Sequence, residues 1–439
     1  MGVVMMINEI KIEKLFGRFN YDIALKEDGV TILTGPNGYG KSTILRLLKV
    51  LREGTVKDIL NYLLNLNFRK VDILFEMLEE KISITKDEDG VTINSNKVPS
   101  KMIKKYSNNL LKSKYVYEIE EDRLLSIVKK NREDLDLSLS EMKELIYGDF
   151  LNQPFYIGKE KSKKDTNILR ELKKIKKIIG PIYFIEEQRL IMQKDNNGKV
   201  NNVIDVIEEL PNKFKTLIRN ISSNYSDTAN RLDNTYPYRL FNTEVGIDEE
   251  EYTQNMNEMT KKFEKLNKYD ISEIQYSRDV CFKKEHAKAL KVYFDDFNEK
   301  YKVYEDFIKK LDLFTNIVNS RLSFKEIKIS RENGIIVTDE SSLNNELKLE
   351  QLSSGEKQEI VLFYDLIFEV PNGVLLLIDE PEISLHIVWQ KKFMDDLLKI
   401  VEYKNLKVIV ATHSPQIINN HWDIQVDLGV LYGNELNKG

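Results

Sequence analysis

The stretch Gly35-Pro36-Asn37-Gly38-Tyr39-Gly40-Lys41-Ser42 decides the fold of this chain. It fits the phosphate-binding pattern G-x-x-x-x-G-K-S/T. The apolar residues Val30, Ile32 and Leu33 predict a strand directly before it, and leucines at helical spacing predict a helix after it. Glycines let successive backbone N–H groups turn inward around phosphates, and the positive end of the following helix points at them. The sequence therefore predicts a nucleotide-binding loop between a buried strand and a helix.

Each polar residue of this loop has an expected task. Lys41 is expected to reach the β- and γ-phosphates, and the Ser42 hydroxyl to bind Mg²⁺. ATP and Mg²⁺ are therefore the predicted nucleotide and cofactor. The predicted nucleotide-binding residues here are Gly35, Pro36, Asn37, Gly38, Tyr39, Gly40, Lys41, Ser42 and Thr43.

A second apolar strand, expected over 374–378, ends in the carboxylate pair Asp379-Glu380. Such a pair is common by itself, but beside a phosphate-binding loop it predicts metal binding and nucleotide hydrolysis. Asp379 is placed to hold the Mg²⁺ shell, and Glu380 is placed to polarise the attacking water as a catalytic base.

The composition excludes several classes of protein. The 439 residues allow two to four domains, and one cysteine, Cys281, excludes a disulfide scaffold or a Cys-based zinc site. No apolar run is long enough to span a membrane, so a cytoplasmic protein without a membrane partner is expected. With 66 basic against 71 acidic residues, the net charge of −5 excludes a histone-like binder but leaves room for a local basic groove.

Hydrophobic patterns predict three parts. Residues 1–100 contain three short strands, the phosphate loop and a β-hairpin, in which Ile82 and Ile84 face Val91 and Ile93 across Asp89-Gly90. Residues 101–322 are expected to be mainly helical, and residues 323–439 return to an α/β pattern with a hairpin over 324–338 that turns at Asn333-Gly334.

The helical part contains two heptad-like runs over about 250–320, which predict a short antiparallel helical hairpin. Its second run, Leu290 to Leu311, and the lysine-rich stretch 159–177 are the surfaces expected to engage a partner or nucleic acid. Ordinary core packing and a solvated helix face are the alternatives for these two features.

Three further motifs carry a resemblance to a known family. They are LSSGEKQ at 352–358, DEPEISLH at 379–386 and ATHSP at 411–415. They resemble the signature motif, the Walker B motif with its D-loop, and the switch-histidine motif of ABC-type ATPases. Their order and long spacing resemble the AAA-type ATPases of the SMC/RecF/OLD-like branch. Together with the segments 183–190 and 232–237, they most resemble the ATPase subunit of Septu-type and retron-linked anti-phage systems.

The resemblance implies an ABC-type ATPase head, with a mixed sheet around the phosphate-loop core, an antiparallel β-subdomain and a large helical insertion. Two heads would sandwich two ATP molecules, each site combining the loop of one head with the signature of the other. Ser353 and Gly355 would meet the γ-phosphate, and Ser354 and Glu356 belong to the same nucleotide-binding set.

The resemblance also assigns two catalytic roles outside the loop. His413 would sense the γ-phosphate, and Gln188, in a candidate Q-loop over 183–190, would contact Mg²⁺ and the attacking water. Phe16, Arg18 and Phe19 are further candidates for contacting adenine or phosphate.

The implied function is an ATP-hydrolysing dimeric switch that controls a separate effector, expected to be an HNH-type nuclease, in anti-phage defence. A RecF-like repair ATPase that clamps DNA directly is the alternative, and an ATP-dependent scaffold with little turnover is another. A transporter subunit is disfavoured, because 312 positions separate Lys41 from Ser353, whereas the family resemblance implies an insertion of only on the order of one hundred residues in a transporter. Full OLD nucleases add a Toprim domain after the ATPase, and because only 23 residues follow Gln416, no intrinsic nuclease is expected.

Overall fold

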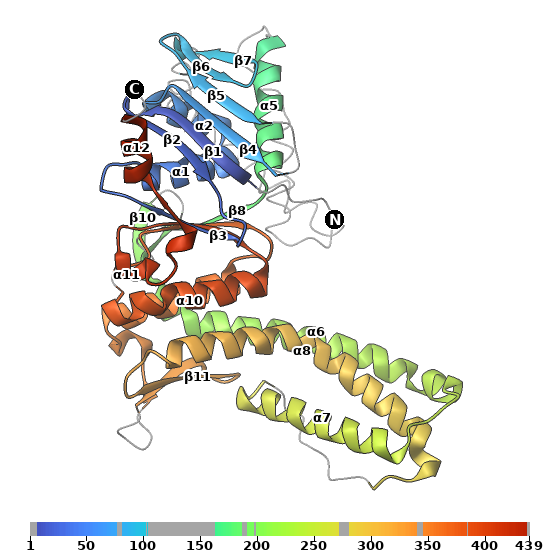
Figure 1. Cartoon of the computed structure of the whole chain (residues 1–439). Coiled ribbons are helices and arrows are strands. Elements are labelled where there is room, and N and C mark those ends of the chain that lie inside the picture. The colour runs from blue at the N-terminus through green and yellow to red at the C-terminus, as the bar shows by residue number, and fades with distance from the viewer. Residues whose placement is uncertain are drawn as a thin grey trace. The chain divides into compact units, whose positions relative to one another are not determined.

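The computed structural model describes residues 7–76, 81–101, 103, 163–186, 191–196, 199–271, 281–339, 346–383 and 385–436. Its chain forms two units, coloured along the sequence in Figure 1. The first unit comprises Met1–Glu186, Asn372–Pro381 and Val401–Gly439, and the second Glu187–Pro371 and Glu382–Ile400. The phosphate loop, Asp379, Glu380 and His413 therefore belong to the first unit, and the signature segment to the second. The domain boundaries expected from the sequence remain a prediction.

A five-stranded parallel sheet in the first unit has the order β16-β3-β15-β14-β8. Its strands are β3 (Val30–Thr34), β8 (Ile182–Ile185), β14 (Leu375–Asp379), β15 (Lys407–Ala411) and β16 (Gln425–Asp427). All five residues of β3 are buried, as expected for a sheet covered on both faces. The strands predicted before the phosphate loop and before Asp379-Glu380 are therefore confirmed.

A six-stranded antiparallel sheet in the same unit has the order β2-β1-β4-β5-β6-β7. Its strands are β1 (Ile7–Leu15), β2 (Phe19–Ala24), β4 (Lys70–Phe75), β5 (Ile82–Lys86), β6 (Gly90–Ile93) and β7 (Asn96–Pro99).

The hairpin predicted over 82–93 is present, with Ile84 paired to Ile93, but its turn lies one residue earlier than expected. The N–H of Asp87 bonds to the carbonyl of Gly90, so Glu88 and Asp89 are the central residues. The Asp87 carboxylate accepts the N–H groups of Asp89 and Gly90 at 3.0 and 2.9 Å, which fixes the turn there.

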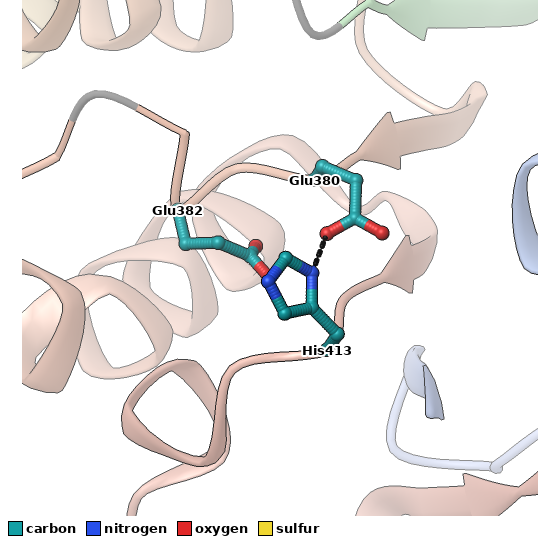
Figure 2. Close-up of side chains that lie close together, drawn as sticks. All are labelled: Glu380, Glu382 and His413. Carbon is teal, nitrogen blue, oxygen red and sulfur yellow. Dashed lines mark hydrogen bonds and ion pairs between the residues drawn. The ribbon is translucent and has the colours of Figure 1, made fainter. Parts of the chain in front are cut away.

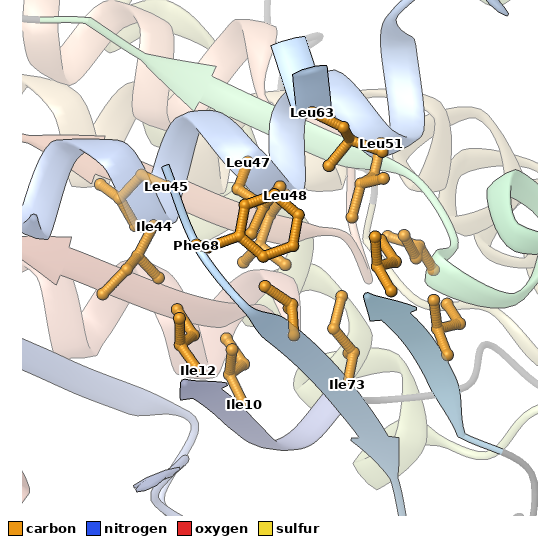
Figure 3. Packing of buried hydrophobic residues seen from close by; sticks show 14 of the residues in the cluster. Ile10, Ile12, Ile44, Leu45, Leu47, Leu48, Leu51, Leu63, Phe68 and Ile73 are labelled. Atoms are coloured by element: carbon orange, nitrogen blue, oxygen red, sulfur yellow. The ribbon is translucent and has the colours of Figure 1, made fainter. Parts of the chain in front are cut away.

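Helix α1 (Lys41–Glu53) joins the two sheets of the first unit. It packs against the parallel sheet and shares one hydrophobic core with the antiparallel sheet, part of which Figure 3 shows. Its buried apolar residues are Ile44, Leu45, Leu47, Leu48 and Leu51, the helical spacing seen in the sequence. The other helices that the structure describes in this unit are α2 (Val56–Asn65), α5 (Lys163–Ile179), α11 (Pro415–Ile418) and α12 (Leu428–Leu436), with a 3₁₀ turn at Trp422–Ile424.

The second unit is built around long helices. They are α6 (Val206–Asn242), α7 (Glu249–Lys268), α8 (Ala287–Asn319), α9 (Ser354–Tyr364) and most of α10 (Ile387–Lys404). Its strands are β9 (Ile191–Asn196), β10 (Lys199–Asp205), β11 (Lys325–Ser330), β12 (Gly334–Asp339) and β13 (Glu346–Leu347). The described part of this unit also contains short turns at Lys284–His286 and Leu349–Gln351 and a π-helical turn at Asp365–Glu369. Among the described helices of both units, none has the length and apolar character needed to cross a membrane.

The predicted helical hairpin is present as α7 and α8, where the rings of Phe263 and Phe297 lie 4.9 Å apart. Helix α6, which the heptad pattern did not include, also packs along α8, with Tyr225 5.1 Å from Tyr304. Because α8 has neighbours on two sides, most of its Leu290–Leu311 seam is buried. The seam is therefore core packing, and it is not an open surface for a partner.

The β11–β12 hairpin is present, but its turn comprises residues 331–333, because Gly334, expected in the turn, pairs with Ser330 as the first residue of β12. Gly334 provides a test of the packing of this hairpin. We expect Gly334→Ala to destabilise the protein more than Gly373→Ala, although both glycines have left-handed φ angles, 75° and 70°. In each variant, holding an alanine in the left-handed conformation costs about 1–2 kcal/mol of stability. A methyl group at Gly334 would also collide with the carbonyl oxygen of Pro211 in α6, whereas Gly373 faces open space. Overpacking adds about 1–3 kcal/mol, so urea unfolding that ranks the two variants equally would contradict the α6–β12 contact.

Candidate functional site

The phosphate loop begins where β3 ends and finishes in the first turn of α1. Gly35, Gly38 and Gly40 have φ angles of 139°, 84° and 92°, a region that other residues rarely adopt. A side chain at Gly40 would come within 2.6 Å of Leu15 Cδ2, so the loop lies against the antiparallel sheet. Pro36, Asn37 and Gly38 form its exposed tip.

Lys41 is held inside this loop. Its side chain is 5% exposed, and its Nζ donates a hydrogen bond to the carbonyl oxygen of Gly35 at 2.9 Å. The same Nζ lies 3.9 Å from Glu380 Oε1. A buried ammonium group with three donors at this place can supply the counter-charge for a bound polyphosphate.

Ser42 and Asp379 meet beside the loop. The Ser42 Oγ, in the first turn of α1, donates to Asp379 Oδ1 at the end of β14 at 2.8 Å. Asp379 is 4% exposed. A hydroxyl and a carboxylate are the hard oxygen donors that Mg²⁺ prefers, so these residues fit the ion expected from the sequence. Thr43 follows in α1, with its carbonyl oxygen accepting from the Tyr62 hydroxyl at 3.2 Å.

Glu380 connects Lys41 to His413. Its Oε2 is 2.6 Å from His413 Nδ1, as Figure 2 shows, while its Oε1 faces Lys41. The backbone of Glu380 has a φ of 46° and its N–H bonds to the carbonyl of Ala411 at 2.8 Å. A strained backbone of this kind costs about 1–3 kcal/mol and is common at active sites. Figure 2 also draws Glu382, two residues further along the chain.

The signature residues belong to the second unit. Ser353 caps α9, and its hydroxyl pairs with Glu356 in a capping box. Glu356 also accepts from Lys325 Nζ at 2.9 Å. Burial raises the pKa of Glu356, but the hydrogen bonds from Lys325 and Ser353 outweigh it and hold that pKa below its usual value. Glu356 thus has a capping task that the sequence patterns did not assign, and Ser353 and Ser354 are exposed at the helix N-terminus, with Gly355 half-buried.

The structure does not place Gln188, and it buries Phe19, two residues for which the sequence predicts a role at the nucleotide. Gln188 lies outside the described residues, so its Q-loop role stays a prediction. Phe19, expected as a possible adenine contact, is buried, with Tyr39 and Tyr432 packed on it at 4.8 and 4.9 Å. Arg18, exposed with its guanidinium 5.3 Å from the Phe19 ring, and Phe16 remain the candidates there. The sequence motifs end at residue 415, so they gave no indication that Tyr432 packs on Phe19.

The sequence matches the AAA ATPase domain family over residues 5–418. This chain is a member of that family. No curated protein matches this AAA ATPase.

Solved structures of SMC head domains resemble the chain at low identity. One, from Pyrococcus furiosus with an extended coiled coil bound to the C-terminal domain of ScpA, is 15% identical over 95% of this chain and 92% of that chain, with a TM-score of 0.36. A second, bound to the C-winged helix domain of ScpA, is 13% identical over 94% and 92%, with a TM-score of 0.39. A third, from Thermotoga maritima, is 14% identical over 94% and 91%, with a TM-score of 0.32.

The position of Glu380 predicts the effect of its neutralisation. We expect Glu380→Gln to retain ATP binding and to slow hydrolysis by roughly 10²-fold or more, because the amide keeps the shape but cannot accept a proton from water. Phosphate release and ATP titration on the same preparations measure the two steps. Asp423→Asn, an exposed acid of the same unit, is the matched control. Wild-type turnover by Glu380→Gln would exclude the role of Glu380 as a base.

Proposed function

We propose that this AAA ATPase binds and hydrolyses ATP and works as a nucleotide-dependent dimeric switch. The observation that carries the proposal is the position of Glu380 between Lys41 and His413, next to the Ser42–Asp379 pair. Lys41 and the loop N–H groups bind the phosphates, and Ser42 and Asp379 hold Mg²⁺, which neutralises phosphate charge when bound.

Hydrolysis itself needs one proton acceptor. Water attacks the γ-phosphorus, Glu380 takes a proton from that water, and the bond to the ADP oxygen breaks, giving ADP and phosphate. The contact with Glu380 orients the His413 imidazole, whose side chain is 54% exposed, and we assign His413 to sensing the γ-phosphate.

The dimer rests on the signature residues. Ser353 and Ser354 stand exposed at the N-terminus of α9, an eleven-residue helix whose dipole favours an anion at that end. In the proposed sandwich this end meets the γ-phosphate held by a second copy. Because only the triphosphate can contact both heads, ATP favours the closed dimer and hydrolysis releases it.

The dimer proposal predicts complementation between two inactive variants. Lys41→Ala chains should lose ATP binding, and Gly355→Asp chains should lose the signature, because a carboxylate there repels the phosphate. A mixed dimer should regain one intact composite site, and hence up to about half of the wild-type rate. Differently tagged chains, purified as verified mixed dimers, provide the measurement. Mixed dimers as inactive as either parent would contradict the sandwich.

The proposed target of the switch is a separate effector protein. The resemblance to anti-phage ATPase subunits supports a separate effector, with an HNH-type nuclease as the expected class. ATP occupancy of the dimer would control that partner. The three helices α6, α7 and α8 extend the second unit and carry exposed aromatic residues near the end of α6, including Phe241 at 86% exposure. They supply surface area that the nucleotide site does not use.

Direct nucleic-acid binding is a second candidate, favoured by one face of α5. Arg170, Lys173, Lys174 and Lys177 are exposed and spaced so that they share a side of the helix. Lys176 points to the protein instead, where burial, and then Arg52, lowers its pKa. A row of cations of this kind can follow a phosphate backbone, as a RecF-like clamp requires.

The α5 face predicts a salt-dependent effect. Reversing Arg170, Lys173, Lys174 and Lys177 to Glu should weaken DNA or RNA binding at least about tenfold and lower the salt slope by about 0.9 for each lost phosphate contact. ATP hydrolysis without nucleic acid should persist. The control reverses four exposed lysines of the second unit, Lys261, Lys283, Lys284 and Lys288. Binding that responds equally to both sets would exclude the α5 face. In the same assays with ATP and Mg²⁺ or Mn²⁺, robust cleavage by the protein alone would contradict a separate effector.

A further inference from the structure

The segment after the switch-histidine motif returns to the phosphate loop. Strand β16 pairs in parallel with β3, and its last residue, Asp427, stands opposite Thr34, the residue before the loop. The Gln425 side-chain amide donates to Thr34 Oγ1 at 2.6 Å. The sheet therefore brings residues 425–427 to the start of the loop, although nearly 400 positions separate them in sequence.

The first turn of α12 then lies directly behind the loop. A Cβ added at Gly35 would be 3.3 Å from Leu428 Cβ and 3.4 Å from the backbone nitrogen of Gly429. A Cβ added at Gly429 would be 3.4 Å from Pro36 Cδ. The loop at Gly35 and Pro36 therefore lies close to the first turn of α12, with little room for a side chain at either Gly35 or Gly429.

Asp427 holds this turn in place. Its Oδ1 accepts the N–H groups of Gly429 at 2.7 Å and Val430 at 3.2 Å, which otherwise have no partner in the first turn of a helix. Leu428, between Asp427 and Gly429, is fully buried. The carboxylate of Asp427 therefore fixes the backbone that supports Gly35 and Pro36.

The next turn of α12 contacts the other end of the loop. The Tyr432 ring lies 6.2 Å from the Tyr39 ring at 89°, and both pack on Phe19. The Tyr39 carbonyl also accepts the Tyr21 hydroxyl at 2.8 Å. Burial, then the neighbouring Tyr39 and Tyr432, raises the pKa of Tyr21, so that hydroxyl stays a donor.

We propose that Asp427 and Tyr432 are positioning residues that keep the phosphate loop in its nucleotide-binding conformation. They support it at Gly35 and at Tyr39, the two ends between which the backbone N–H groups must converge. The loop contains three left-handed glycines, so its own sequence gives it little stiffness. External support lowers the ordering cost of binding and so raises affinity. The inference rests on the proposed function only in taking ATP as the ligand.

The test uses paired variants of the full-length protein. Tyr432→Ala and Asp427→Ala should each weaken Mg·ATP binding about three- to tenfold by calorimetry and raise KM in parallel, with kcat at saturating ATP unchanged within about twofold. Tyr432→Phe keeps the ring, and Asp427→Asn keeps an acceptor for the helix N–H groups, so both should restore affinity. Val430→Ala, at a site 59% exposed on the same helix, is the control that should change nothing.

A second readout does not need nucleotide. Amide hydrogen exchange of a peptide covering 35–41 should become faster in the two alanine variants and stay at the wild-type rate in the two conservative ones. Unchanged affinity together with unchanged exchange in Tyr432→Ala and Asp427→Ala would overturn the proposal. So would a lower Tm with wild-type KM, since that is the result of a merely structural role. Faster exchange in a protein whose wild type fails to bind ATP would support the positioning role and refute the ATPase function.

Discussion

The parallel pairing of β3, β15 and β14 is the constraint on which the site depends. Leu33, Ala411 and Asp379 are in register across these strands, so the segments that follow them leave the sheet at one edge. A slip of one residue would move a strand by about 3.3 Å and turn its side chains to the other face. The 2.8 Å contact between Ser42 and Asp379 would then be lost. The polar residues at the strand ends therefore meet only because the apolar residues of the strands fix the register of the sheet.

In the second unit, a buried arginine fixes the orientation of the helix that carries the signature. Arg321, just after α8, forms ion pairs with Glu359 of α9 and Asp396 of α10 and lies 4.6 Å from the Phe363 ring. Burial raises the pKa of Glu359 to about 7, although the Arg321 charge opposes this. Buried ion pairs of this type add little net stability, but removing one partner costs about 3–5 kcal/mol. Arg321 therefore fixes how the helix that begins at the signature is oriented within its own unit.

Much of the first unit could be predicted because its signals are local. The strand before Gly35, the helix after Ser42 and the strand before Asp379 follow from short periodic patterns, and the structure confirms them. The β5–β6 turn was displaced by one residue because the Asp87 side chain competes for the turn N–H groups, which a Gly-based rule ignores. Helix α6 was missed as a partner of α8 because it is mostly polar and contains Pro211 and Pro237, which weaken any helical pattern.

The sequence by itself indicated the groups from which the chemistry proposed for this AAA ATPase is built: a glycine loop with Lys41 and Ser42, a carboxylate pair, a signature and a histidine, each recognisable from neighbouring residues. The tertiary structure decided which of these groups touch. It brought Glu380 to both Lys41 and His413, assigned Glu356 to capping α9, and placed Asp427 and Tyr432 behind the loop. These contacts join residues tens to hundreds of positions apart. They depend on strand register and helix packing, which are properties of the whole fold and leave no motif in a single segment.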